Sequence, residues 1–228
     1  MNFNISANHV YRILKYLAIG LAIAGLGGLI SNHAFGDFFL KPTLLRLTDL
    51  KEEVSIGTWY SSSILLVSSL LLFVISRIEE KTDGAYTRHW TFLAMLFVFL
   101  SLDEAASIHE IGDGLHDVLG IATATTFLWT LPYTILLVIF VFSYRKFLLA
   151  LSPRTRRLFI LSGGVFIFGA LGLELAAAAI TQFGFPQFVP LTVIVEEFCE
   201  IFGVTLFIYA LTSHISSLVK GINISFGQ

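Results

Sequence analysis

Six apolar runs, each close to the length of a membrane-spanning helix, constrain this sequence more than any other feature. A helix needs about 20 apolar residues to cross the hydrocarbon core of a bilayer. Charged residues make up only 13% of the chain, about half the usual share in soluble domains. We therefore predict an all-α, polytopic integral membrane protein, a six-helix transmembrane bundle that forms one domain over residues 1–228. The expected helices are 11–31, 56–76, 90–110, 121–144, 158–182 and 188–214.

The basic residues predict how this bundle is oriented, because Lys and Arg in short connections favour the cytoplasmic side of a membrane. Eleven of the fourteen lie on one side of the predicted bundle, and the exceptions are Lys41, Arg46 and Lys51. We therefore expect a multi-pass protein with both termini in the cytoplasm. The first run could also be a signal peptide, but it is longer than the apolar core of such a peptide. We expect it to be a retained helix.

The connection between the first two spans is the one long segment expected outside the cytoplasm. Pro42 suits the start of a helix, and the leucines from Leu44 to Leu50 are interspersed with charged residues. This spacing gives the segment one apolar face, so we predict a short helix along the outer membrane interface. It serves either as a connector or as a lid over a substrate site.

Carboxylates within three of the apolar runs are the main functional signal, because ionisable groups inside a membrane span are costly and usually functional. The runs 90–110, 158–182 and 188–214 carry them, and the central parts of the other three carry none. At a rise of about 1.5 Å per residue, these acids fall in the outer half of a core about 30 Å thick. We therefore expect three helices to form one shared site. The acids are Asp103, Glu104, Glu110, Glu174, Glu196, Glu197 and Glu200.

Charge balance predicts what this site holds. The seven acids share their runs with His109 and with no Lys or Arg near the acids. Carboxylates crowded in a low dielectric need protons, water or bound cations. Carboxylate and imidazole ligands suit Fe, Mn or Zn, with Ca as the option if histidine is not a ligand. We expect one or two divalent metal ions; a proton or cation pathway and purely structural hydrogen bonding are the alternatives.

Helical phase assigns roles to the individual acids. Asp103 and Glu110 are seven residues apart and share a face with His109 beside it, whereas Glu104 points elsewhere. In the 188–214 run, two glutamates stack at i, i+4 and Glu197 lies one step round. Glu104 and Glu197 are predicted to orient the ligands or to act as the general base in catalysis. The predicted metal ligands are Asp103, His109, Glu110, Glu174, Glu196 and Glu200.

The motifs of familiar metal enzymes are absent from the sequence. A set of Glu and His residues on helices is similar to the di-iron and di-manganese carboxylate bundles, but their Glu-x-x-His spacing does not occur. The His-x-x-x-His pair of alkaline-ceramidase-type membrane hydrolases does not occur either. A zincin motif, a phosphate-binding loop and a nucleophile elbow are likewise missing.

Three functions fit these features. The first is a membrane-embedded metalloenzyme acting on a lipid or another apolar substrate, either by hydrolysis or, with iron, by oxygen chemistry. The second is a transporter for divalent cations or protons. The third is a non-catalytic subunit of a larger membrane complex, with an oligomer also compatible with the sequence. Membrane lipids are expected partners, and a net charge of -2 gives no basic surface for nucleic acid.

Overall fold

The structure of the protein is a computed structural model that describes residues 6–34, 36–37, 39–50, 52, 54–108 and 125–219, without the side chains of residue 33 and of residues 125–131. Within these ranges all regular structure is helical, as predicted. The elements are α1 (Ala7–Ala34), α2 (Lys41–Thr48), α3 (Ile56–Lys81), α4 (Thr87–Ala106), α6 (Thr125–Ala150), α7 (Pro153–Ile167), the π-helical η2 (Phe168–Leu173), α8 (Glu174–Gln182), the 3-10 turn η3 (Pro186–Phe188) and α9 (Val189–Leu218).

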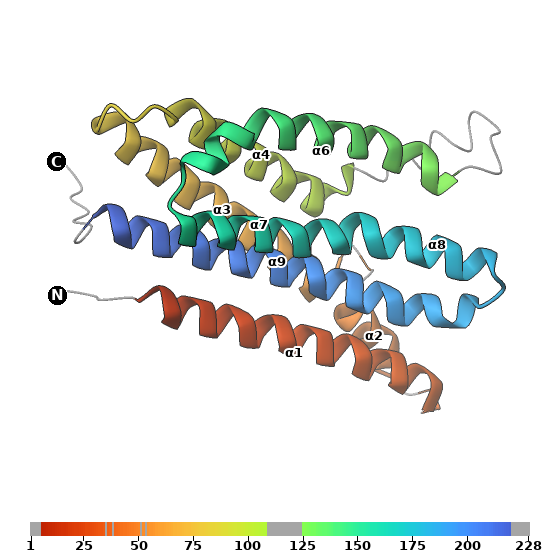
Figure 1. Ribbon diagram of the computed structural model, residues 1–228. Coiled ribbons are helices and arrows are strands. Elements are labelled where there is room, and N and C mark those ends of the chain that lie inside the picture. The colour runs from red at the N-terminus through yellow and green to blue at the C-terminus, as the bar shows by residue number, and fades with distance from the viewer. Residues whose placement is uncertain are drawn as a thin grey trace.

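The long helices pack side by side as a bundle, with the start of α1 and the end of α9 at the same end (Figure 1). Five helical segments are long and apolar enough to cross a membrane, which makes the chain a multi-spanning membrane protein by helix composition. They are Ala7–Asn32, Ile56–Lys81, Thr87–Ala106, Pro132–Ala150 and Pro153–Gln182. The sixth predicted span, α9, is not among them, so the count of six is not confirmed. The orientation of the termini stays a prediction.

The run predicted to end at Glu110 forms α4, which ends earlier than expected. α4 stops at Ala106, and Ser107 adopts a left-handed conformation with φ 50° and ψ 43°. The backbone N–H of Ser107 donates to the carbonyl oxygen of Asp103, a common way for a helix to terminate. Glu110 lies outside the described residues, so the prediction that it shares a helical face with Asp103 stays a prediction.

A short helix, α2, lies where one was predicted between the first two spans. It has Pro42 in its first turn, and the residue Leu50 that follows it packs between two glycines. A Cβ on Gly25 of α1 would lie 3.2 Å from Leu50 Cδ1, and a Cβ on Gly57 of α3 would lie 2.7 Å from Leu50 Cδ2. Leu50 thus fixes the connection to the bundle. Its position along a membrane interface stays a prediction.

Serine side chains spaced seven residues apart join α3 to α4. Ser62 Oγ donates to the Ser101 carbonyl at 2.9 Å, and Ser101 Oγ donates to the Ser62 carbonyl at 2.8 Å. Ser69 Oγ donates to the Ala94 carbonyl at 2.8 Å, and Ser76 Oγ lies 2.7 Å from a threonine hydroxyl of α4. Small polar residues of this kind let membrane helices approach closely.

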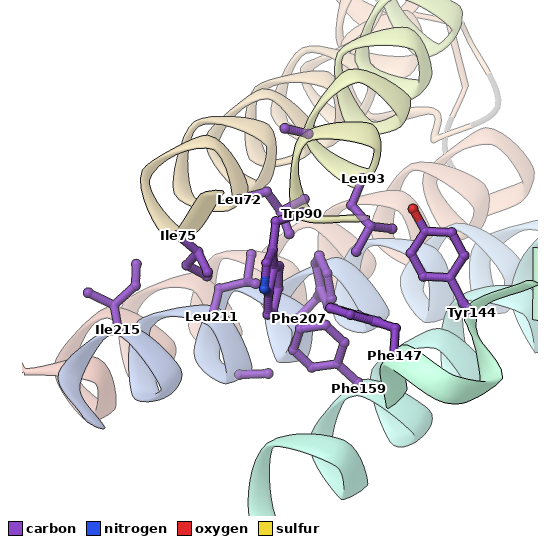
Figure 2. Packing of buried hydrophobic residues seen from close by; sticks show 12 residues of the cluster. Leu72, Ile75, Trp90, Leu93, Tyr144, Phe147, Phe159, Phe207, Leu211 and Ile215 are labelled. Atoms are coloured by element: carbon purple, nitrogen blue, oxygen red, sulfur yellow. The ribbon is translucent and has the colours of Figure 1, made fainter. Parts of the chain in front are cut away.

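At the end of the bundle where α1 starts and α9 ends, the interior is aromatic (Figure 2). Trp90 of α4 is 1% exposed and packs edge-on against Phe147 of α6 and Phe159 of α7, with ring centroids 4.8 and 5.9 Å apart. Trp90 also stacks on His214 of α9 at 5.3 Å. This packing fixes α4, α7 and α9 relative to one another, so it also sets which residues meet at their other ends.

Candidate functional site: an acid cluster of α4, α8 and α9

Three glutamates lie within little more than one turn of α9. Glu196, Glu197 and Glu200 are half-buried, and the Oε2 atom of Glu196 is screened from solvent. Their carboxylates interact electrostatically with one another. Because α9 contains no Lys or Arg, it does not itself supply a charge to compensate them.

The next acid, Glu174, is the first residue of α8 and directly follows the π-helical segment η2. Its carboxylate interacts electrostatically with that of Glu200. Gly169 within η2 lies so close to α9 that a Cβ there would be 2.9 Å from the Glu196 carbonyl oxygen and 3.0 Å from Glu200 Cγ. Only a glycine lets the two backbones approach at this level. Short π-helical segments of this kind are frequent at functional sites.

The last turn of α4 adds two half-buried carboxylates. Glu104 interacts electrostatically with both Glu197 and Glu200. Glu104 was predicted to act beside the ligands of the shared site, and its carboxylate lies within electrostatic range of these two acids of α9. Asp103 interacts with Tyr133 of α6, and its Oδ1 atom is screened from solvent.

Three helices that are far apart in the sequence thus bring five carboxylates together, and Asp49, just after α2, adds a sixth through its interaction with Glu197. Lys and Arg are absent from α8 and α9, and α4 carries only Arg88, in its first turn. Like charges at such a site repel one another unless they bind protons or cations. The five carboxylates are those of Glu104, Glu174, Glu196, Glu197 and Glu200.

All of these acids lie in a stretch that matches a known family. The family described as "Domain of unknown function (DUF8692)" covers residues 15–215. The chain belongs to this family. No curated protein and no solved structure matches the chain. The DUF8692 domain therefore extends from within α1 to within α9, and its description assigns no activity to the acid cluster.

Two of the metal ligands predicted from the sequence, His109 and Glu110, lie outside the described residues. Among the residues that are described, no group of three or more His, Cys, Asp or Glu side chains is arranged to hold one metal ion. These acids therefore do not form a complete metal site by themselves. The roles predicted for Asp103, Glu174, Glu196 and Glu200 as ligands stay predictions.

The sequence analysis did not predict two neighbours of the acid cluster, Asp49 and Tyr133. In the sequence, Asp49 is one of several charged residues in a connection, and Tyr133 is an ordinary aromatic residue of an apolar run. Asp49 comes near Glu197 because the adjacent Leu50 is fixed between α1 and α3. The sequence signal that could have indicated the position of Asp49 was Leu50. This leucine ends a polar segment, and an apolar side chain there is expected to be buried against the helices.

Proposed function

We propose that the acid cluster is a cation-binding centre and that the protein is a metal-dependent membrane enzyme acting on a lipid-like or other apolar substrate. The observation that supports this proposal is the proximity of Glu104, Glu174 and Glu200, which come from three different helices. A bound cation offsets the repulsion between such carboxylates, whereas burial alone makes it worse.

In this proposal the acids have two different roles, proton transfer and cation binding. Glu104 and Glu197, which interact with each other, accept and hold the proton that moves in the reaction. The other acids, together with two residues after α4, bind one or two divalent ions of Fe, Mn or Zn. These proposed ligands are Asp103, Glu174, Glu196, Glu200, His109 and Glu110. Because the described residues do not form a three-ligand set, cation binding requires the segment after α4 or a rearrangement of the acids.

The surroundings of the cluster suit an apolar substrate. Leu102, next to Asp103, is 56% exposed, and Leu175, next to Glu174, is 40% exposed. Apolar side chains exposed on a membrane-spanning helix face the acyl chains of lipids. A lipid-soluble substrate can therefore reach the acids sideways from the bilayer, without passing through the aromatic core at the other end.

Transport of divalent cations or protons is the second candidate, and the π-helical segment before Glu174 favours it, since irregular helices beside buried charges are typical of ion sites in transporters. The aromatic core opposes it. Phe97 of α4 stacks on Phe207 of α9 with ring centroids 4.8 Å apart, and Trp90 is 1% exposed. An ion path to that end of the bundle would require these rings to move.

The direct test is the metal content of the full-length protein, purified in detergent and measured by mass spectrometry. We expect about one to two equivalents of a transition metal in the wild type and a small fraction of that in an E197Q/E200Q double variant, because one proposed ligand and one neighbouring negative charge are lost. The matched control, E52Q/E80Q, removes two exposed acids elsewhere in the chain. It should keep its metal.

Each other outcome has a definite meaning. Less than about half an equivalent of any transition metal in the wild type would contradict the metal proposal. Metal that persists in E197Q/E200Q would place the ion elsewhere. Cation or proton flux into liposomes that the wild type supports and this variant loses would establish transport. Bound metal that only raises thermal stability, with neither flux nor turnover, would favour a non-catalytic subunit of a larger complex.

A further inference from the structure

A cavity of about 470 Å³ lies far from the acid cluster, between the start of α7 and α9. The start of α7 lies toward the end of the bundle where α1 starts and α9 ends (Figure 1). The lining of the cavity combines two arginines with apolar and aromatic groups: Pro153, Arg154, Arg157, Leu158 and Tyr209. We propose that this cavity binds the headgroup of an anionic phospholipid. The site is independent of the acid cluster, so either proposal can fail alone.

Arg154 and Arg157 supply the positive charge of the cavity. Both are exposed, and Arg154 Nη2 donates to the Tyr209 hydroxyl at 3.2 Å. Within the described part of the chain, the ion pairs are Lys41–Asp37 and Arg77–Glu80. Neither arginine is therefore paired with a described acid, and both guanidinium groups can meet a phosphate, for which arginine is well suited.

α1 places a lysine beside an aromatic neighbour of the cavity. The ring of Tyr11 packs against that of Tyr209 with centroids 5.0 Å apart. Lys15 Nζ lies 5.8 Å from the centroid of the Tyr11 ring, a distance at which cation and ring attract each other. A cation of α7 and a cation of α1 thus each lie beside one of two contacting tyrosines, a residue type enriched at membrane interfaces.

The outer face of α7 and the start of η2 offer a path for an acyl chain below the cavity. Arg157, Leu161, Gly164 and Phe168 are spaced by four, three and four residues, so they lie along one helical face. Leu161 and Phe168 are 53% and 56% exposed, and a Cβ on Gly164 would meet no atom within 4 Å. The rise from Arg157 to Phe168 is about 16 Å, close to half of a hydrocarbon core about 30 Å thick.

These features fit a phospholipid better than free phosphate. The arginines match the phosphate, while Leu158 and the exposed face of α7 match the apolar part that free phosphate lacks. Residues 145–157 contain five basic residues and no acid. The orientation predicted from such residues places the lipid in the cytoplasmic leaflet, which carries most of the anionic lipid.

The test is a titration of the full-length protein in non-ionic detergent with phosphatidylglycerol and with phosphatidylcholine of the same acyl chains, followed by native mass spectrometry. We expect tighter binding of phosphatidylglycerol, and a loss of about 30-fold in its affinity in R154Q/R157Q, since each basic residue near a membrane contributes about a factor of five. The matched control K81Q/R88Q removes two exposed charges from the same end of the bundle. It should retain nearly all of the affinity.

A second variant tests the cavity rather than the charge. Leu158→Trp fills the space while all basic residues stay, so it should also weaken phosphatidylglycerol binding, and it decides the question if R154Q/R157Q does not fold. Millimolar inorganic phosphate should not compete with the lipid. The proposal is overturned by equal binding of the two lipids, by equal losses in R154Q/R157Q and K81Q/R88Q, by full affinity in Leu158→Trp, or by competition from phosphate.

Discussion

Two of the polar contacts that α4 makes within the bundle differ in kind. Toward α3, the hydroxyls of Ser62 and Ser101 each donate to the backbone carbonyl of the other residue. Toward α9, the carboxylate of Glu104 interacts electrostatically with those of Glu197 and Glu200. The serine contact satisfies its own donors and carries no net charge. The glutamate contact gathers charge of one sign that the three helices do not compensate.

This difference distinguishes polar side chains that only hold membrane helices together from those that we expect to serve a function. A serine hydroxyl both donates and accepts, so the backbone of a neighbouring helix is a sufficient partner. An ionised carboxylate only accepts, and another carboxylate cannot serve as its partner. A cluster of carboxylates therefore needs protons, cations or water from outside the helices, and a site that needs an outside partner is where we expect function.

The largest effect on stability is expected at Gly169, where η2 approaches α9 closely. Gly169→Ala places a methyl group 2.9 Å from the Glu196 carbonyl oxygen, and such overpacking costs about 1–3 kcal/mol. Gly163→Ala on α7 meets no atom within 4 Å, so it should be neutral or slightly stabilising. Thermal unfolding of both variants in detergent checks this prediction. Equal melting temperatures would contradict the close approach of η2 to α9.

An effect of intermediate size on stability is expected from Glu197→Gln, which tests whether the carboxylates of the acid cluster repel one another. In the presence of a chelator, Glu197→Gln should raise the free energy of unfolding by about 1 kcal/mol, because one of several like charges is removed. Added Mn²⁺ should then stabilise the wild type more than the variant. Glu52→Gln, at an exposed position, is the control. A variant less stable than the wild type in chelator would show that the favourable contacts of Glu197 outweigh its repulsion by the other acids.

The smallest effect on the free energy of unfolding is expected at the serines that join α3 to α4. Ser62→Ala and Ser101→Ala should each destabilise the protein by about 0.6 kcal/mol, the usual size of hydrogen bonds between membrane helices. The double variant should lose less than the sum, because both bonds belong to one pair. A double-mutant cycle on unfolding free energies measures this. Ser63→Ala, whose hydroxyl bonds to its own helix at Trp59, should show no coupling to Ser101.

The sequence predicts the helices and the set of acids well. Apolar runs near 20 residues long leave few alternatives to membrane-spanning helices. The second run starts at Ile56 and the fifth ends at Gln182, and α3 and α8 do the same. That the acids are confined to three runs can also be read directly from the chain, because charge is visible in the sequence without knowledge of the packing.

Which acids meet depends on the packing of the helices. Helical phase places Asp103 and Glu104 on different faces of α4, but it does not say which of them interacts with α9; in the structure the carboxylate of Glu104 does so. The local sequence also hides the end of α4, since Ala105 and Ala106 are strong helix formers. The closeness of Gly169 to α9 is equally invisible. Periodicity along one helix carries no information on where a second helix crosses it, and electrostatic contact between helices depends on that crossing.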